Sequence, residues 1–440
     1  MGLALRLDMF YRYLVGMTPH KRKIFAIVKN LLEWYSQNAR DLPWRSRKAG
    51  RDPYAIWVSE IMLQQTQVKT VIPFWNRWMR ELPTIEAAAK ASPAKIHKLW
   101  EGLGYYTRVR NLQKAAKQIV NRRRDEFHES PSKSKIGDWQ ISSLQIQSKC
   151  RFPEDFDDVL ALPGIGRYTA GAICSIAFNQ PTPILDGNVI RVLTRIFGIA
   201  ENPKEKETNA RLWKLAEQLV SHASRITHHA NNSRTRTRRK DEDDCCSHLN
   251  QSLMELGALV CTPRNPQCGI CPVNKLCVAF RENRVEELPN LGKRETMTAR
   301  RFVAFVAERN GKFLVRQRPA GVVNAHLWEF PNVETTNRKS DPELAAKYIL
   351  GVAPSGIEPL ATVKHSITRY RITLEGYRVS FGGTSSTSPH LIKTRLGTPG
   401  TRPSENIGVW KSPAQMQWLA FTAAHKKLAS LAANRILSNR

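Results

Sequence analysis

The sequence predicts two domains of different classes: a mainly α-helical region over residues 18–280 and an α/β domain over residues 298–440. Apolar residues recur every three or four positions through much of the first region, which is the period of an amphipathic helix. Beyond residue 298 the period changes to two, which is typical of half-buried strands. Residues 281–297 between them are charged and contain Pro289 and Gly292, as expected of a linker.

Residues 18 to about 127 are expected to form a bundle of short helices. Apolar residues such as Ile24, Val28 and Leu31 recur at helical spacing, and the same spacing returns at Ile56 and Ile61. Proline breaks a helix interior but is tolerated in the first helical turn. Each of four prolines is therefore predicted to lie where one helix ends or the next begins: Pro53, Pro73, Pro83 and Pro93.

Two polar stretches without an apolar period interrupt the helical region, at residues 128–150 and 224–247. The second contains a block of Arg and Lys followed directly by a block of Asp and Glu, and such blocks usually stay solvated. We expect both stretches to be insertions in loops. Helical patterning returns at residues 156–178, 189–197, 210–220 and 249–260.

The C-terminal region contains short runs rich in β-branched and aromatic residues. These runs lie at residues 302–306, 312–316 and 369–374 and are typical of strands. Asn310-Gly311 and Gly382-Gly383 are turn signals between strands. A closing helix is expected near residues 423–436, which completes an α/β domain.

The composition indicates an anionic partner. The chain has 440 residues, and its 68 Lys+Arg against 38 Asp+Glu give a formal net charge of +30. Nucleic acid is the first candidate, because basic side chains that bind phosphates release condensed counterions. A ribosomal-type protein and a solvated basic surface are the alternatives. With 41% hydrophobic residues, disorder over the full length is excluded.

The sequence contains no uncharged apolar run long enough to span a membrane, and charged residues interrupt the apolar stretch at residues 1–17. We therefore expect no membrane partner and no secretory signal. The expected location is the bacterial cytoplasm, at the nucleoid, or the nucleus or mitochondrion in a eukaryote.

Four cysteines lie within seventeen residues directly after a predicted helix, with six, two and five residues between successive cysteines: Cys261, Cys268, Cys271 and Cys277. Disulfides are disfavoured without a secretory signal, because cytosolic thiols stay reduced. Structural zinc sites usually pair two short Cys-x-x-Cys knuckles, and only one is present here. The wider spacing favours a four-iron cluster, and zinc is the alternative.

A glycine-containing turn precedes an apolar helix at Leu162-Pro-Gly-Ile-Gly-Arg-Tyr-Thr-Ala-Gly171. Gly164 and Gly166 permit a tight turn that exposes backbone N–H groups at a helix N-terminus, where a phosphate oxygen can bind. Alone, two such glycines are more often an ordinary connector. Asp186, which precedes the next helix, would alone be an N-cap. The hairpin, the following Asp and the four cysteines together resemble the helix-hairpin-helix–Gly-Pro-Asp superfamily, in its endonuclease III-like iron–sulfur branch.

Three further segments resemble the adenine DNA glycosylase (MutY) family within that branch: Leu42–Arg45, Trp57–Val68 and Gly102–Tyr106. The resemblance covers nearly all of residues 40–280 apart from the two insertions. It implies a monomeric, monofunctional enzyme of base excision repair that removes adenine mispaired with 8-oxoguanine or guanine in double-stranded DNA and so prevents G:C to T:A transversions. It also implies a [4Fe–4S] cluster on the four cysteines.

The resemblance implies roles for individual residues. Glu60 lies on an apolar helical stretch, where a carboxyl is either paired or held at a raised pKa. It would protonate the flipped adenine and later activate water, while Asp186 stabilises the cationic sugar. Tyr168 stands where bifunctional relatives have a lysine and cannot form a Schiff base. Tyr168 and Asn188 would help to hold these groups in place. The residues that match the adenine pocket are Trp44, Arg45, Leu63 and Gln251.

Residues beside the opposing base are also implied by the resemblance. Gln65 corresponds to the wedge that fills the space left by the flipped adenine, and Thr66, Leu103 and Tyr105 would lie beside the oxidised guanine. A polar helix turn at residues 64–66 and a tight helix end at residues 102–106 are the alternatives when each motif is taken alone.

Residues 298–440 resemble the Nudix-like domain that the family uses to recognise oxidised guanine, at Leu327–Pro331 and Trp410–Pro413. No Glu-rich helix follows Glu334, so we expect no nucleotide hydrolysis. The family's lesion-recognition loop is Phe-Ser-His, whereas this chain has Ile367-Thr368-Arg369. Thr368 retains a hydroxyl that can donate a hydrogen bond.

Two other functions fit part of the pattern. A thymine or uracil mismatch glycosylase has the same predicted fold, but Gln65-Thr66 and the Nudix-like domain disfavour it. A structural DNA-binding protein would need only the hairpin and the basic surface, and the presence of both Glu60 and Asp186 disfavours that reading.

Overall fold

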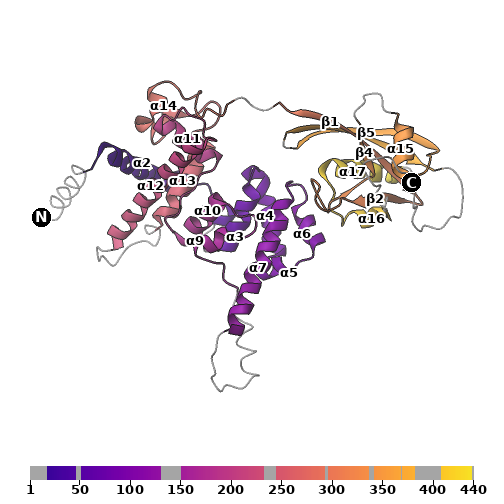
Figure 1. Ribbon diagram of the computed structural model, residues 1–440, viewed down its shortest axis with the longest axis horizontal. Coiled ribbons are helices and arrows are strands. Elements are labelled where there is room, and N and C mark those ends of the chain that lie inside the picture. The colour runs from indigo at the N-terminus through magenta and orange to yellow at the C-terminus, as the bar shows by residue number, and fades with distance from the viewer. Residues whose placement is uncertain are drawn as a thin grey trace, which may run out of the picture. The chain divides into compact units, whose positions relative to one another are not determined.

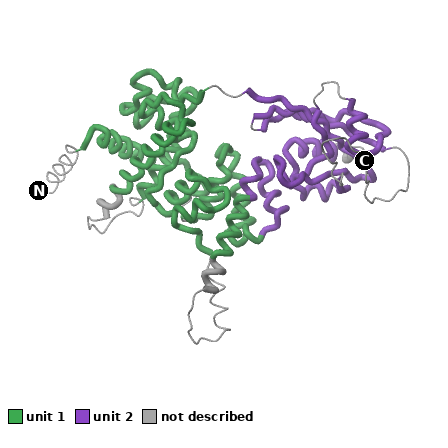
Figure 2. Tube along the Cα trace, viewed as in Figure 1, with its two compact units in different colours: residues 1–90, 111–293 green, residues 91–110, 294–440 purple. Residues whose placement is uncertain are grey.

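The computed structural model describes residues 17–45, 51–129, 150–231, 244–292, 296–335, 341–367, 369–381 and 408–438. Features predicted elsewhere lie outside the described residues, including the N-terminal stretch, most of the first insertion, the Gly382-Gly383 turn and Thr368. The chain forms two compact units, shown in Figure 2. The first unit comprises Met1–Lys90 with Asn111–Lys293, and the second comprises Ala91–Arg110 with Arg294–Arg440.

The first unit is a bundle of short helices, as predicted (Figure 1). Its helices are α2 (Pro19–Asn38), α3 (Pro53–Leu63), α4 (Val68–Glu81), α5 (Ile85–Lys90), α9 (Phe156–Leu160), α10 (Arg167–Phe178), α11 (Gly187–Phe197), α12 (Lys206–Asn231), α13 (Cys245–Leu259) and α14 (Val278–Arg281). The 3₁₀ turns η1 (Pro43–Arg45), η4 (Cys268–Ile270) and η5 (Asn274–Leu276) complete it, and α7 (Thr107–Glu129) begins in the second unit.

The prolines define most of the predicted helix boundaries. Pro53 begins α3, where the side chain of Asp52 caps the first turn by accepting a hydrogen bond from the N–H of Tyr54. Pro83 follows Leu82, the C-cap of α4. The prediction for Pro73 was wrong, because Pro73 lies inside α4. The helix continues through it because one face of α4 buries Val71, Trp75 and Trp78, and that burial offsets the lost backbone hydrogen bond.

Helix α13 lies at the centre of the first unit and packs against α2, α10, α11 and α12. Its apolar face explains why the second predicted insertion is shorter than residues 224–247. Cys245, Cys246 and Leu249 are buried in the main core, so α13 begins at Cys245, and α12 extends to Asn231 before the described chain stops. Consecutive residues of α13 are buried, so its four neighbours surround most of the helix.

The second unit is an α/β fold, as predicted. Its strands are β1 (Thr298–Arg309), β2 (Lys312–Gln317), β3 (Trp328–Glu329), β4 (Asn332–Thr335), β5 (Gly356–Ile367), β6 (Tyr370–Ser380) and β7 (Val409–Lys411). They form a mixed sheet in the order β3-β2-β1-β6-β5, with β4 paired to β1 and β7 paired to β2. The β1–β6 pair is parallel, and the Asn310-Gly311 turn joins β1 to antiparallel β2.

Helices cover both faces of this sheet. One apolar cluster joins Phe313, Phe330 and Leu374 to Leu428 of α17 (Ala423–Ser438), and a second joins Phe305 to Leu350 of α15 (Pro342–Leu350). The other helices of the unit are α6 (Pro93–Trp100) and α16 (Pro413–Met416). Every helix in the described part of the chain is too short or too polar to cross a membrane.

Candidate active site and cluster cavity

Helix α3 places a carboxyl group in an apolar environment. Tyr54 to Met62 are all buried, and Glu60 among them is 5% exposed. Burial raises the pKa of Glu60 to about 7, and the nearby charge of Asp186 also raises it, while a hydrogen bond from Tyr168 and the charge of Arg45 oppose the rise. Near neutral pH, Glu60 therefore exists in protonated and ionised forms in comparable amounts and can donate or accept a proton.

Tyr168 connects Glu60 to the helix that follows the hairpin. Its hydroxyl oxygen lies 3.0 Å from Oε2 of Glu60 and 3.3 Å from the sulfur of Met254 on α13. Burial raises the pKa of Tyr168 well above its ordinary value, and the carboxyl groups of Glu60 and Asp186 add to the rise. The phenol therefore stays neutral and can donate its proton to Glu60 in a hydrogen bond. Three helices, α3, α10 and α13, meet at this point.

Asp186 is the N-cap of α11. Its Oδ1 accepts a hydrogen bond of 2.8 Å from the N–H of Val189, and its Oδ2 accepts one of 3.1 Å from the side-chain amide of Asn188. Burial raises the pKa of Asp186, and these hydrogen bonds oppose the rise. The N-cap interpretation is thus correct as local structure. Because Asp186 also interacts electrostatically with Glu60 and Tyr168, it belongs to the same site as well.

A buried ion network holds one of the residues predicted to contact adenine. Arg45 forms a short ion pair with Glu255, and Nε of Arg40 lies 2.6 Å from the other oxygen of Glu255. Sequence reasoning missed Glu255, whose side chain is fully buried in α13. The signal was present, because an acidic residue on the buried face of a helix needs a cationic partner. Trp44 is buried beside Trp75, and Leu63 is partly buried at the end of α3.

Gln251 has an acceptor without a partner among the described residues. Its Nε2 donates to the hydroxyl oxygen of Ser247 over 3.0 Å, while its buried Oε1 has no hydrogen bond. Gln251 precedes Met254 by three residues on α13, so the two side chains lie on one face of that helix. Met254 in turn contacts Tyr168, which places Gln251 on the side of α13 that faces the site.

Two of the residues predicted as wedge and lesion contacts, Gln65 and Tyr105, have an unusual backbone conformation. Gln65 is exposed directly after α3 with a φ of +57°, and Tyr105 is 42% exposed with a φ of +48°. A positive φ in a residue other than glycine is uncommon, and such residues are concentrated at functional sites. Thr66 lies in the first unit, whereas Leu103, which is buried, lies with Tyr105 in the second.

The hairpin has the predicted backbone geometry. Gly164 has a φ of +80°, and a Cβ atom at this position would lie 2.6 Å from Cβ of Asn111. Gly166 is the N-cap of α10 and has no side chain to satisfy the first N–H groups of the helix. Those N–H groups are therefore available to a phosphate oxygen.

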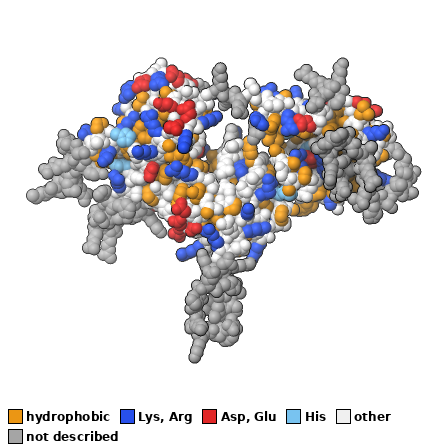
Figure 3. Space-filling view, in the orientation of Figure 1, with side chains coloured by type: hydrophobic (Ala, Val, Ile, Leu, Met, Phe, Trp, Pro, Cys, Tyr) orange, Lys and Arg blue, Asp and Glu red, His pale blue; other side chains and the backbone are white. Residues whose placement is uncertain are grey.

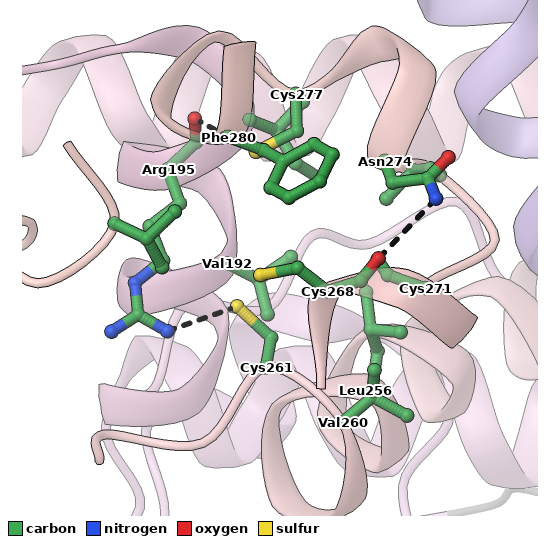
Figure 4. Close-up of a pocket in the computed structure, with 13 residues that line it drawn as sticks. Val192, Arg195, Leu256, Val260, Cys261, Cys268, Cys271, Asn274, Cys277 and Phe280 are labelled. Carbon is green, nitrogen blue, oxygen red and sulfur yellow. Dashed lines mark hydrogen bonds between the residues drawn. The ribbon is translucent and has the colours of Figure 1, made fainter. Parts of the chain in front are cut away.

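The four predicted ligand cysteines line one cavity, shown in Figure 4. Cys261 follows α13, Cys268 begins η4 and Cys271 is its C-cap, and Cys277 is the N-cap of α14. In the described residues, no three Cys, His, Asp or Glu side chains converge as they would on a single metal ion. The four thiols line a space whose other walls are mostly apolar, with residues such as Leu256 and Phe280, and include the polar side chains of Arg195 and Asn274.

Arg195 on α11 gives the cavity a positive wall. It is 2% exposed, and its Nη1 lies 3.4 Å from the sulfur of Cys261 and 2.8 Å from the carbonyl oxygen of Thr262. Its Nε donates to the carbonyl oxygen of Leu288 over 2.8 Å. A buried guanidinium that faces a thiol suits an anionic group held by thiolates, so the residues present fit an iron–sulfur cluster.

Basic side chains are widely distributed at the surface. Figure 3 shows Lys and Arg over both units on the face in view, in agreement with the formal net charge of +30. A surface of this kind attracts a polyanion.

Comparisons with protein families match three parts of the chain. Residues 58–218 match the model of HhH-GPD superfamily base excision DNA repair proteins, and residues 261–277 match the iron–sulfur binding domain of endonuclease III. Residues 302–431 match the NUDIX domain. The second match favours an iron–sulfur cluster over zinc.

Curated relatives match most of the chain. An adenine DNA glycosylase of Rattus norvegicus is 33% identical over 458 aligned residues, which cover 92% of this chain and 77% of the rat protein. One from Homo sapiens is 32% identical, with 82% of this chain and 68% of the human protein covered. One from Buchnera aphidicola is 33% identical, with 71% and 76% covered.

Proposed function

We infer the chemistry of the site from the premise that this chain belongs to the adenine DNA glycosylase family of helix-hairpin-helix base excision repair proteins. The chain is accordingly a DNA glycosylase of base excision repair that acts on adenine, with an iron–sulfur cluster held by its four clustered cysteines. We propose that its substrate is double-stranded DNA with adenine opposite 8-oxoguanine or guanine, and that it acts as a monomer.

Glu60 is the proposed acid and base of the reaction. Its pKa of about 7 leaves a large protonated fraction at neutral pH, and this observation supports the proposal most directly. The protonated carboxyl would donate to an imidazole-ring nitrogen of the flipped adenine, which makes the base a better leaving group. After the bond to the sugar breaks, the Glu60 carboxylate would take a proton from the attacking water.

Asp186 is the proposed stabiliser of the sugar cation. Hydrogen bonds from Val189 and Asn188 hold its carboxylate in one orientation, so the negative charge is in place before the cation develops. Two carboxyl groups with different environments then have different roles, as in the hydrolysis of other glycosidic bonds.

We propose that the reaction stops at the abasic site. Tyr168 supplies a neutral phenol where strand cleavage through an imine would need an amine, and its hydroxyl is directed to Glu60 and Met254. Release of adenine should therefore leave the strand intact until alkali is added.

Adenine would be held by residues on three elements. The free Oε1 of buried Gln251 suits the exocyclic amino group of adenine, which is a hydrogen-bond donor. Arg45 is held by Glu255, so its guanidinium has a defined position near Glu60. The N-terminus of α10, behind Gly164 and Gly166, would bind a phosphate of the lesion strand.

The four cysteines would hold the [4Fe–4S] cluster, with Arg195 facing it. When bound, the cluster supplies four iron–thiolate bonds that cross-link the loop after α13 to α14.

A single-turnover assay tests the proposal. The protein is mixed with a duplex that contains adenine opposite 8-oxoguanine, and with an adenine·guanine duplex in parallel, and half of each sample is treated with alkali. We expect adenine release from both, faster opposite 8-oxoguanine, with strand breaks after alkali. Glu60→Gln should bind the duplex and release no adenine. Strand breaks without alkali, or substantial activity of Glu60→Gln, would contradict the assigned roles.

A further inference from the structure

A segment between α5 and α7 belongs to the second unit, although the helices around it in the sequence belong to the first. This segment is Ala91–Arg110, and it contains α6 and residues 102–106. Its hydrogen bonds to the C-terminal part of the same unit join residues more than 200 positions apart in the chain. The sequence offered no signal for this pairing.

Glu101 is the centre of these contacts. Its side chain is 5% exposed, and Oε1 accepts a hydrogen bond of 3.0 Å from the N–H of Phe421. Its Oε2 accepts one of 2.8 Å from Nζ of Lys426, on α17, and one of 2.9 Å from Nζ of Lys98. Nζ of Lys98 also lies 3.2 Å from the carbonyl oxygen of Leu419. The carboxylate thus joins the end of α6 to the segment 419–426.

The charge of Glu101 is well compensated. Burial alone would raise its pKa, but the hydrogen bonds from Lys426, Lys98 and Phe421 outweigh burial and leave the pKa below its ordinary value. A buried carboxylate that accepts three hydrogen bonds prefers one geometry, because any displacement leaves a charge without partners.

The next residues of the chain are held to the same frame. Nε1 of Trp100 donates to the carbonyl oxygen of Gly104 over 3.0 Å, and Nη2 of Arg108 donates to the carbonyl oxygens of Leu103 and Gly104. The Arg108 guanidinium also lies over the rings of Trp100 and Tyr105. Side chains that precede and follow residues 102–105 therefore hold this loop by hydrogen bonds. Because Trp100 is adjacent to Glu101 in the chain, we expect the position of the loop to depend on that of Glu101.

Two further contacts join the segment Ala91–Arg110 to the C-terminal part of the unit. Nη1 of Arg110 donates to the carbonyl oxygen of Ala325 over 3.1 Å, and the ring of His97 stacks on that of His326 with 6.5 Å between centroids. Because these contacts do not involve Glu101, the segment should stay docked when Glu101 is altered and lose only part of its alignment.

We propose that Glu101 is a positioning residue for recognition of the opposing base. It ties the loop that contains Leu103 and Tyr105 to the C-terminal domain, so that both parts face the base opposite adenine as one surface. This inference rests on the proposed function and on the family resemblance, which implies that Leu103 and Tyr105 lie beside 8-oxoguanine. Glu101 itself touches no base. Its loss should slow adenine release opposite 8-oxoguanine and leave release opposite guanine unchanged, which weakens discrimination between the two bases.

The test compares two duplexes in four full-length proteins: wild type, Glu101→Gln, Lys426→Met and Lys427→Met. Lys427→Met is the matched control. Lys427 is an exposed neighbour of Lys426 on α17, and its substitution removes the same charge. Each protein is assayed for single-turnover adenine release opposite 8-oxoguanine and opposite guanine, and its Tm is measured. Lys426 is 53% exposed, so its variant should fold even if Glu101→Gln does not.

We expect the ratio of the two rates to fall about tenfold in Glu101→Gln and severalfold in Lys426→Met, as for loss of a charge-assisted hydrogen bond. In Glu101→Gln and Lys426→Met the rate of adenine release opposite guanine should stay at the wild-type value. In Lys427→Met the ratio of the two rates should stay at the wild-type value. A fifth protein that combines Glu101→Gln with Lys426→Met should have the same ratio as Glu101→Gln, because both substitutions remove the same contact.

Several outcomes would overturn the inference. One is a rate ratio that is unchanged in both Glu101→Gln and Lys426→Met. A second is an equal loss of the rate of adenine release on both duplexes that parallels a fall in Tm. A third is a wild-type protein that does not prefer 8-oxoguanine. A wild-type protein that releases no adenine from either duplex would instead contradict the proposed function itself, so the two failures are distinct.

Discussion

The hydrogen bond between Tyr168 and Glu60 leads to a prediction about pH dependence. Tyr168→Phe removes the hydroxyl that lies 3.0 Å from Oε2 of Glu60 and leaves the ring in place. The bond favours the ionised carboxyl, so its loss raises the pKa of Glu60 above the value of about 7. A hydrogen bond to a charged group contributes about 1.5–3 kcal/mol, and each pKa unit corresponds to about 1.4 kcal/mol.

The measurement is the pH profile of single-turnover adenine release. The protonated form of Glu60 is the active acid, so the wild-type rate should fall as the pH rises through about 7. In Tyr168→Phe the same fall should occur roughly one to two pH units higher, whatever the height of the plateau. The position of the fall therefore reports on this bond independently of any other loss of activity.

Tyr54→Phe is the matched control. Tyr54 lies on the same helix, and its hydroxyl donates to the carbonyl oxygen of Leu82 over 2.9 Å, so the chemical change is identical but Glu60 keeps its partner. The alkaline fall should stay at the wild-type pH in this variant. If the fall does not move in Tyr168→Phe, or moves to lower pH, Glu60 is not the acid whose pKa the phenol controls.

Further predictions concern stability, DNA binding and the cluster. Folding raises the pKa of Glu60, so the free energy of unfolding falls as the pH rises from about 4.5 to about 7. Glu60→Gln removes this titration. In denaturant titrations its free energy of unfolding should exceed that of wild type by up to about 3 kcal/mol at pH 8 and should not exceed it at pH 4. Gly164→Ala should weaken duplex binding at least severalfold in a titration with uncleavable DNA, since its φ of +80° and the contact with Asn111 oppose a Cβ atom; unchanged affinity would exclude the hairpin as a phosphate site. Glu255→Gln should lower the free energy of unfolding by about 3 kcal/mol, because two arginines lose their buried counter-charge. Cys268→Ala should lose visible iron–sulfur absorbance and lower the Tm, and a variant that keeps both would contradict the ligand set.

Several elements could be predicted because their signals are local. Asp52 with Pro53 and Ser92 with Pro93 place a cap and a first turn next to each other, and α3 and α6 begin there. Asn310-Gly311 permits the two positive φ angles of a tight hairpin between β1 and β2. The prediction of a helix boundary at Pro73 was wrong, because α4 is stabilised by packing against helices that lie elsewhere in the sequence.

Strand β5 shows a similar limit. It lies at the edge of the sheet and contains Pro359, beside which the register with β6 shifts. A proline in a strand is tolerated at an edge, where one side of the backbone needs no partner. The sequence around Pro359 therefore had a weak strand signal, and only its position in the sheet made the strand possible.

The kinds of element and the two domain classes could be predicted from the sequence because they depend on the local spacing of apolar, proline and glycine residues, whereas the candidate cluster ligands and catalytic residues came from the resemblance to a family. The chemical behaviour of those residues depends on contacts between distant parts of the chain. Glu60 has a pKa near 7 because the fold buries it away from water, Glu255 pairs with Arg45 across 210 residues, and Glu101 accepts a hydrogen bond from Phe421 across 320. Desolvation and long-range ion pairs depend on which surfaces pack together, and that is a property of the folded chain rather than of any local pattern.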